Sequence, residues 1–235
     1  MWLKNSSIGR KVVMSVTGIA LVLFLTFHMG MNLVAVFSNP DYTDPLNNGY
    51  NQICHFLGAN WYALVGTLGL AALFIIHIIY AIWLTIQNRK ARGNERYDVV
   101  ERRETVKWAS QNMFVLGLIV VIGLGLHLFN FWYNMQFQEI LGNETAVTAI
   151  GNVAVYDGYQ FIKLAFANPI YTALYVVWLV ALWFHLTHGF WSAIQTIGWS
   201  NDLWINRWKT ISNIYSTIIV VCFLFVVVWF YVGSL

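Results

Sequence analysis

A chain of 235 residues that is 59% hydrophobic and only 10% charged does not have the composition of an ordinary soluble domain, in which about a quarter of the residues are charged. The composition predicts an all-α integral membrane protein whose main partner is the lipid bilayer. The net charge of +3 is small, and we expect no nucleic-acid partner.

Five apolar stretches are long enough to cross a bilayer, which takes about 20 residues in a helix. They cover about 12–37, 58–86, 110–133, 169–197 and 210–233. The segments 38–57 and 134–168 are polar and aromatic, and prolines lie in or beside them, so we expect outer loops there, the longer one with a short interfacial helix. No residues remain for a soluble domain, so the sequence predicts a single membrane domain over 1–235.

The basic residues predict the orientation of this domain. All but one of the 13 Lys and Arg residues precede the first stretch, separate the second from the third, or separate the fourth from the fifth. The exception is Lys163. Because cytoplasmic loops carry the excess of positive charge, we expect a cytoplasmic N-terminus and an external C-terminus.

Five of the six histidines lie inside the apolar stretches, where charged residues are nearly absent. His28, His77, His127 and His185 occupy one each of the first four, and His188 follows His185 by about one turn. Polar groups are costly in hydrocarbon and commonly mark a functional site, although a lone histidine often only bonds a neighbouring helix. One histidine on each of four successive helices favours a functional site.

The predicted orientation sorts these histidines into two depths. His28 and His127 lie in the outer halves of their helices, and His77 and His185 lie in the inner halves. A six-coordinate haem iron needs two facing imidazoles at one depth, whereas zinc prefers a compact tetrahedral set that the sequence lacks. There is no C-x-x-C-H motif for covalent haem attachment. The pattern therefore predicts two haem b groups, with glycines inside the spans leaving room for a flat porphyrin, although small residues also serve ordinary helix packing.

These motifs resemble the di-haem cytochrome b subunit of succinate dehydrogenase and fumarate reductase complexes, in the five-helix, single-anchor form that works with menaquinone. The resemblance covers almost the whole chain and is carried by Ser15–Gly18, Phe27–Asn32, Ile76–His77, Leu126–His127 and Phe184–Trp191. It implies that the first four helices form a haem-binding bundle, with the fifth peripheral. His28 and His127 would then ligate the outer haem, and His77 and His185 the inner one.

We expect two further residues, Ser15 and His188, to lie beside a haem. The resemblance implies that Ser15 contacts a haem propionate and that His185 is the ligand rather than His188. From spacing alone, His188 remains an alternative ligand, a partner for a propionate, or a cap for a neighbouring group.

The resemblance also implies partners and a location. The complex would lie in the bacterial cytoplasmic (inner) membrane, with a flavoprotein subunit for the dicarboxylate chemistry and an iron–sulfur subunit that exchanges electrons with this chain. We expect no catalytic dicarboxylate residue in this chain. The docking surface would include the segment with Lys4, Arg10 and Lys11 and the basic loop from Arg89 to Lys107, although such charges also set topology and attract anionic lipid.

A menaquinone site is expected near the outer haem. Its candidate residues are Asn32, Tyr50, Asn51, His55 and Asn130. His55 is the candidate proton acceptor, because histidine titrates near neutral pH. The alternatives are that these residues only bond loop backbone or water, or that the quinone binds near His77 and His188. Some relatives carry a glutamate at the outer start of the second helix, but residues 49–58 of this chain contain no acid. Some also carry a glutamate two positions before the fourth haem ligand, where this chain has Trp183.

Two other functions fit parts of the pattern. A b-type subunit of a membrane hydrogenase or formate dehydrogenase also carries histidines on helices, and neighbouring genes would distinguish it. A haem-free transporter or structural membrane protein would be colourless when purified, and the lack of internal repeats argues against transport.

Overall fold

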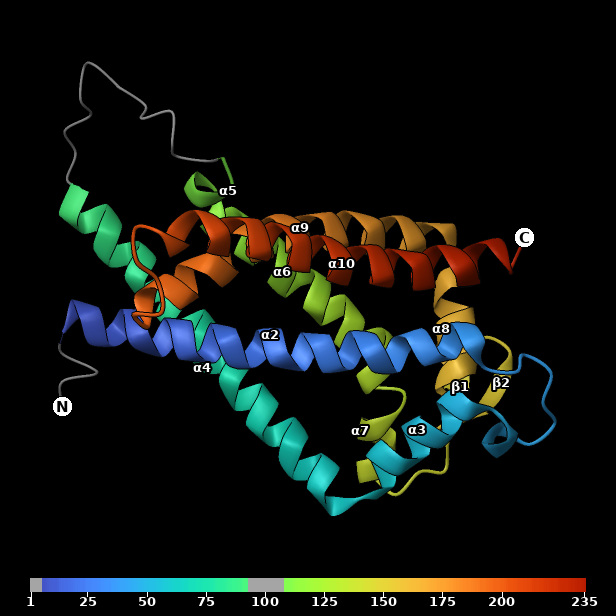
Figure 1. Cartoon of the computed structure of the whole chain (residues 1–235). Coiled ribbons are helices and arrows are strands. Elements are labelled where there is room, and N and C mark those ends of the chain that lie inside the picture. The colour runs from blue at the N-terminus through green and yellow to red at the C-terminus, as the bar shows by residue number, and fades with distance from the viewer. Residues whose placement is uncertain (1–5, 93–107) are drawn as a thin grey trace. The chain divides into compact units, whose positions relative to one another are not determined.

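The computed structural model describes residues 6–92 and 108–235 (Figure 1). Within these residues, five helices are long and apolar enough to cross a membrane. They are α2 (Ser7–Phe37), α4 (Trp61–Arg92), α6 (Met113–His127) with its π-helical continuation η2 (Leu128–Trp132), α9 (Pro169–Thr196) and α10 (Trp204–Val232). A short helix, α5 (Trp108–Gln111), precedes α6. The chain is an all-α, multi-pass membrane protein, as its composition predicts.

The second spanning helix does not begin near residue 58 as expected. A separate helix, α3 (Gly49–Ala59), occupies the end of the expected 38–57 loop, after a 3₁₀ turn, η1 (Pro45–Asn47). It begins where the Asn48 side chain accepts hydrogen bonds from the backbone N–H groups of Tyr50 and Asn51. It ends because Asn60 has an extended backbone (φ −104°, ψ 134°), which interrupts the helical hydrogen bonds before α4.

The last spanning helix begins at Trp204 rather than near 210. The Asn201 side chain accepts hydrogen bonds from the N–H groups of Leu203 and Trp204, at 3.1 and 3.0 Å, and so caps the first turn. Arg207 and Lys209, expected in a connecting loop, therefore lie in the first turns of α10.

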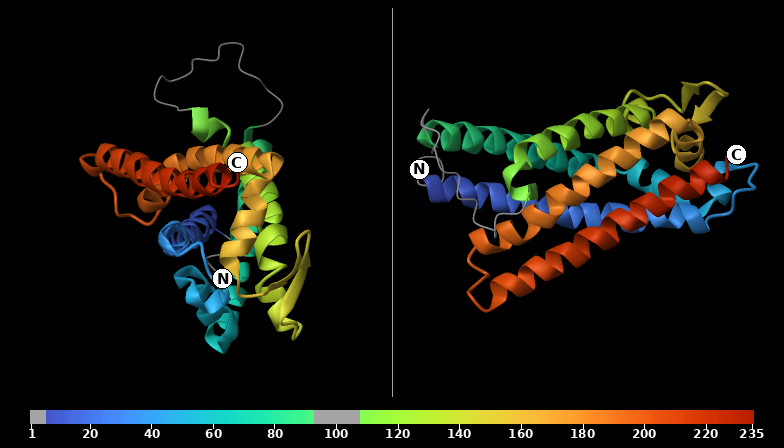
Figure 2. Two further views of the ribbon diagram at one scale, coloured as in Figure 1. Left: turned by 90° about the vertical axis from the view of Figure 1, so that its right-hand side faces the viewer. Right: turned by 90° about the horizontal axis from the view of Figure 1, so that it is seen from above.

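The expected 134–168 loop contains more regular structure than one interfacial helix. It holds α7 (Gln136–Ile140), strands β1 (Thr145–Thr148) and β2 (Gly151–Ala154), and α8 (Gly158–Ala167). The strands pair antiparallel, with Thr145 opposite Ala154, and Gly151 has the positive φ of 108° that a side chain would disfavour. Figure 2 shows the hairpin, in yellow, beside α8. Ala146, Val153 and Phe161 form a small core between the hairpin and this helix.

The chain folds as two compact units, and every spanning helix contributes to both. Unit 1 comprises Met1–Phe24, Gly69–Leu118 and Ala181–Thr217. Unit 2 comprises Leu25–Leu68, Ile119–Val180 and Ile218–Leu235.

Small buried side chains join α9 to α10 in unit 1. Ser212 and Ser216 are fully buried, and the Ser212 hydroxyl lies 3.2 Å from the carbonyl oxygens of Leu186 and Thr187, to which it donates. Small polar residues let spanning helices approach closely and supply the interhelical hydrogen bonds. The α9 turn that carries His185 is therefore held against α10.

A buried carboxylate joins two segments of unit 2 that lie outside the spanning helices. Asp157, the N-cap of α8, accepts hydrogen bonds at Oδ1 from the Asn51 side chain (2.8 Å), the Tyr42 hydroxyl (2.7 Å) and the Gln160 N–H (3.1 Å). Asn51 in turn accepts the Tyr159 N–H at 2.9 Å. Burial and the Asp157 carboxylate raise the pKa of Tyr42, so its hydroxyl stays protonated and remains a donor.

Candidate functional site

One histidine pair lies in unit 1. His77 from α4 and His185 from α9 have ring centroids 6.5 Å apart, with ring planes at 65°. The Thr17 hydroxyl of α2 lies 3.2 Å from His77 Nδ1. His185 Nδ1 is buried and has no hydrogen-bond partner among the residues that the structure describes. Two imidazoles from different helices thus lie near one another, and within the described part of the chain only that of His77 has a polar contact at Nδ1.

Glycines on neighbouring helices allow the two rings to pack closely. A Cβ atom at Gly18 of α2 would lie 3.4 Å from His77 Cε1, and one at Gly117 of α6 would lie 3.5 Å from His185 Cε1. Each histidine therefore presents its Nδ1–Cε1 edge to a glycine backbone. Nε2 of each ring lies more than 4 Å from that Cβ position.

The other pair lies in unit 2. His28 from α2 and His127 from α6 have ring centroids 5.7 Å apart and nearly perpendicular planes, at 87°. The Asn32 side-chain nitrogen is 3.3 Å from His28 Nε2 and 3.5 Å from Nδ1, and it donates to the His28 carbonyl oxygen at 2.8 Å. Asn32 thus lies beside the ring without selecting one of its nitrogens.

His127 is enclosed by aromatic side chains. The rings of Phe131, Tyr175 and Trp178 lie 5.1, 6.4 and 5.7 Å from it, centroid to centroid. The Trp178 indole N–H donates to the Val120 carbonyl oxygen at 3.0 Å, and the indole covers the backbone of Gly123, where a Cβ would overlap it. This close approach of Trp178 to α6 was not expected from the sequence, because a tryptophan in an apolar run carries no pairing signal.

The helical pattern changes directly after His127. The next five residues, Leu128–Trp132, are π-helical, a distortion that is frequent at functional sites. Asn130 lies in this segment and donates to the Tyr175 hydroxyl at 3.3 Å. The π turn therefore directs Asn130 toward the aromatic group around His127.

The spacing of both pairs can be compared with that needed for two axial ligands on one iron. Imidazole nitrogens bind metal ions at about 2 Å and the ring centroid lies about 1 Å further out, so opposed axial imidazoles have centroids about 6 Å apart. The observed 6.5 and 5.7 Å lie on either side of this value. Across residues 6–92 and 108–235, no three His, Cys, Asp or Glu side chains gather as a metal site. Axial ligation of a haem iron needs only two histidines, and the centroid spacing of each pair is compatible with it.

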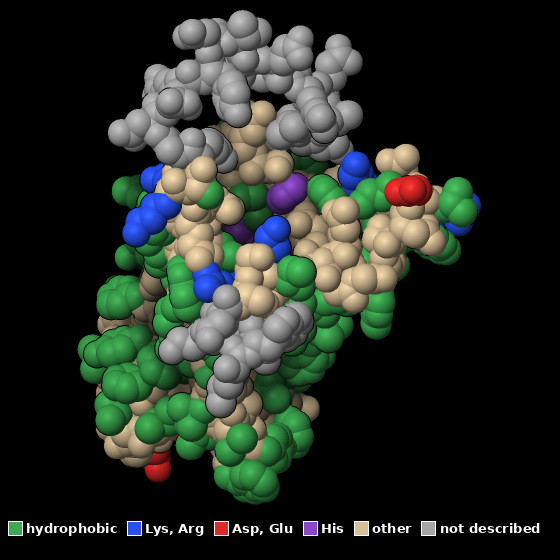
Figure 3. Space-filling model, turned by 90° about the vertical axis from the view of Figure 1, so that its left-hand side faces the viewer, with side chains coloured by type: hydrophobic (Ala, Val, Ile, Leu, Met, Phe, Trp, Pro, Cys, Tyr) green, Lys and Arg blue, Asp and Glu red, His purple; other side chains and the backbone are tan. Residues whose placement is uncertain are grey.

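His188 and Ser15 lie in unit 1 with the first pair. His188 packs against Trp191, with centroids 5.1 Å apart, and the Lys209 ammonium lies 5.2 Å from the same indole. Ser15 is buried, with 5% of its surface exposed. Figure 3 shows Lys and Arg side chains around a histidine on the face that carries the start of α2.

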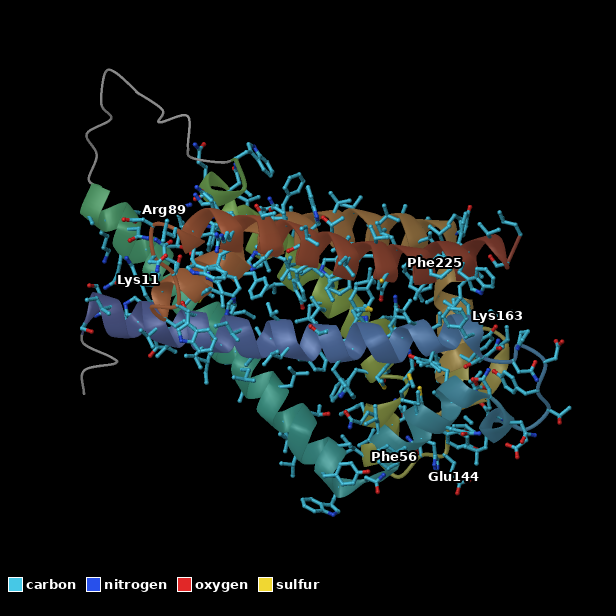
Figure 4. All side chains as sticks on the ribbon, in the orientation of Figure 1. Lys11, Phe56, Arg89, Glu144, Lys163 and Phe225 are labelled. Atoms are coloured by element: carbon cyan, nitrogen blue, oxygen red, sulfur yellow. The ribbon has the colours of Figure 1, made fainter. Side chains whose placement is uncertain are left out.

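The described basic residues are concentrated in one unit. Apart from Lys163 on α8, all of them belong to unit 1. Arg10 stacks over Trp83 at 4.5 Å and Arg89 over Phe114 at 5.5 Å. Figure 4 labels Lys11 on α2 and Arg89 on α4. Lys4 and the predicted loop cations from 93 to 107 lie outside the described residues.

The five candidate quinone residues all belong to unit 2 but do not form one cluster. The Tyr50 hydroxyl donates a hydrogen bond to the side-chain oxygen of Asn32, beside His28, at 3.2 Å. Asn130 instead bonds Tyr175, on the His127 side. Asn51 is fully buried in the Asp157 network, so its contacts are structural.

His55 lies on α3 rather than in a loop, and an acid lies close to it. Its ring packs against Tyr156 with centroids 5.1 Å apart. The Glu139 carboxylate of α7 lies against Gly58, where a Cβ would overlap it. Burial raises the pKa of Glu139, and the nearby His55 lowers it in part. An acid from another element thus lies beside α3, which no local sequence pattern could indicate.

No protein-family model, curated protein or solved structure matches this chain.

Proposed function

We propose that this chain is a di-haem cytochrome b, the membrane anchor of a succinate dehydrogenase or fumarate reductase complex. The observation that carries the proposal is the pairing of four histidines from four spanning helices, His28 with His127 and His77 with His185, at spacings suited to axial ligation. Each pair would hold one haem b, which supplies one-electron transfer when bound. The chain's own contribution is to orient the imidazoles and to exclude water around them.

The unit 1 pair would be the one closer to the iron–sulfur subunit. Its support is the concentration of Arg10, Lys11, Arg89, Arg207 and Lys209 in the same unit as His77 and His185. Positive charge accumulates on the cytoplasmic side of membrane proteins, so the N-terminus would be cytoplasmic and the C-terminus external in a bacterial inner membrane. The iron–sulfur and flavoprotein subunits would bind that side.

The menaquinone site would lie in unit 2, near His28 and His127. Asn32 lies beside the His28 ring and accepts a hydrogen bond from the Tyr50 hydroxyl. Asn130 donates to Tyr175, whose ring packs against His127. Quinol oxidation releases protons, and the His55 imidazole and the Glu139 carboxylate near it would be candidates to accept them. Asn51 would support the site only through the fold of α3.

The experiment is a redox assay on the complex purified from native membranes. A menaquinol analogue should reduce the haem absorbance bands, and added fumarate should then reoxidise them. Reduction by quinol without reoxidation by fumarate would favour the hydrogenase or formate dehydrogenase alternative. A colourless protein would refute the proposal in favour of a haem-free membrane protein.

Variants test the quinone site separately from the haems. His55→Gln, Glu139→Gln and Asn130→Leu should each slow menaquinol oxidation while both haems remain bound. Lys163→Gln, on α8 of the same unit, is the control and should leave the rate unchanged. If all three variants turn over menaquinol at the normal rate, the quinone binds elsewhere, and the neighbourhood of His77 and His188 becomes the site to test.

A further inference from the structure

Thr17 makes a set of contacts that bears on the chemistry of His77. Its side chain is buried, with 4% exposed, in the first half of α2. The hydroxyl oxygen lies 2.9 Å from the Val13 carbonyl oxygen, 3.0 Å from that of Met14, and 3.2 Å from His77 Nδ1. Next to it, the missing side chain of Gly18 lets the His77 Cε1 edge approach the α2 backbone.

These contacts assign the hydrogen atoms. A hydroxyl has one hydrogen to donate, and carbonyl oxygens can only accept, so the two shorter contacts place the Thr17 hydrogen toward Val13 and Met14. In the arrangement that satisfies both the carbonyl and the histidine contacts, the Thr17 oxygen accepts from His77, which puts a hydrogen on Nδ1. In a neutral imidazole with Nδ1 protonated, Nε2 carries the lone pair.

We propose that Thr17 is a positioning residue that holds His77 in the tautomer able to bind haem iron through Nε2. A hydrogen bond from the second ring nitrogen fixes the ring orientation of a ligating histidine and strengthens it as an electron donor. A stronger donor stabilises ferric over ferrous iron and lowers the reduction potential. This inference rests on the proposed function, since it specifies how one of the two ligands of the unit 1 haem is tuned.

The partner ligand lacks this arrangement. His185 Nδ1 is buried without a hydrogen-bond partner within the described part of the chain. Thr17 therefore acts on one ligand of one pair, and its effect should be confined to that haem.

The test compares Thr17→Val, which removes the hydroxyl at nearly constant shape, with Thr17→Ser, which keeps it. Both are made in the full chain within its native complex, with Thr85→Val as control, because the Thr85 hydroxyl bonds the Ala81 carbonyl on its own helix. The readouts are haem content, the midpoint potential of each haem, and the low-spin electron paramagnetic resonance signals. Thr17→Val should favour the ferrous form of one haem about tenfold, a rise of about 59 mV for a one-electron couple.

Thr17→Ser and Thr85→Val should match the parent protein, and the second haem should not shift in any variant. Loss of one haem in Thr17→Val with retention in Thr17→Ser also supports the proposal. The proposal for Thr17 is overturned if Thr17→Val leaves both potentials and spectra unchanged. It is also overturned if Thr17→Val and Thr17→Ser lose the haem equally, because Thr17 would then act only by filling space. A parent protein without haem would instead refute the proposed function, so the two failures are distinguishable.

Discussion

Gly123 provides a sharp test of the packing around His127. The Trp178 indole covers this glycine, and a Cβ there would overlap Cγ, Cδ1 and Nε1, the pyrrole edge of the rigid ring. Such atoms cannot swing aside as the end of a flexible side chain can. Gly123→Ala should therefore displace Trp178 from α6 and break its 3.0 Å hydrogen bond to the Val120 carbonyl.

The expected cost follows from these two losses. Overpacking a closely packed site costs about 1–3 kcal/mol, and the lost hydrogen bond adds about 1 kcal/mol. The better helix propensity of alanine offsets about 1 kcal/mol. Gly123→Ala should therefore lower the free energy of unfolding by about 1–3 kcal/mol.

The matched control is Gly125→Ala. Gly125 is two residues along α6, about 200° around the helix, and a Cβ added there would meet no atom of another element within 4 Å in the described part of the chain. This variant should be unchanged or more stable by up to about 1 kcal/mol. Unfolding of both variants by SDS titration in mixed micelles, followed by circular dichroism, gives the comparison. Equal unfolding midpoints for the two variants would refute the packing of Trp178 on Gly123.

Two other predictions concern unit 2 outside the spanning helices. Asp157→Ala should lower the free energy of unfolding by about 2–4 kcal/mol, because it removes the cap of α8 and strands two side-chain donors. Asp157→Asn, which keeps an acceptor, should cost less, and Asp44→Ala, at an exposed turn, less than about 1 kcal/mol. Burial raises the pKa of Cys54 to about 12, so maleimide should label this thiol at pH 8 only after unfolding. The folded state holds the Cys54 proton more tightly than the unfolded state does, so the free energy of unfolding should decline as the pH rises above about 9. An unfolding midpoint that is independent of pH from 8 to 11 would contradict this.

The spanning helices and their histidines were predictable because hydrocarbon imposes a simple rule. A helix in the bilayer must be long and apolar, so hydropathy alone locates α2, α4, α6, α9 and α10. Histidines stand out against this apolar background, and the structure brings the rings of His28 and His127 near one another, and likewise those of His77 and His185.

The parts outside the apolar runs were less predictable, because long-range hydrogen bonds determine them. The network of Asp157 joins residues more than a hundred positions apart, and nothing near Asn51 in the sequence indicates its partner. Likewise, Glu139 reaches α3 from α7, and Thr17 is one of several threonines in apolar runs until its distance to His77 is known. Helix ends depend on single capping side chains such as that of Asn201, which hydropathy does not register.

The most direct test of the di-haem proposal is the haem content of the purified chain and of its histidine variants. Pyridine haemochrome analysis of the parent protein should give two haem b per chain, with low-spin spectra typical of two histidine ligands. His77→Ala and His185→Ala should each remove the same haem, and His28→Ala and His127→Ala should each remove the other. His188→Ala should keep both. One haem per chain, none, or loss of different haems from the two members of a pair would contradict the assignment.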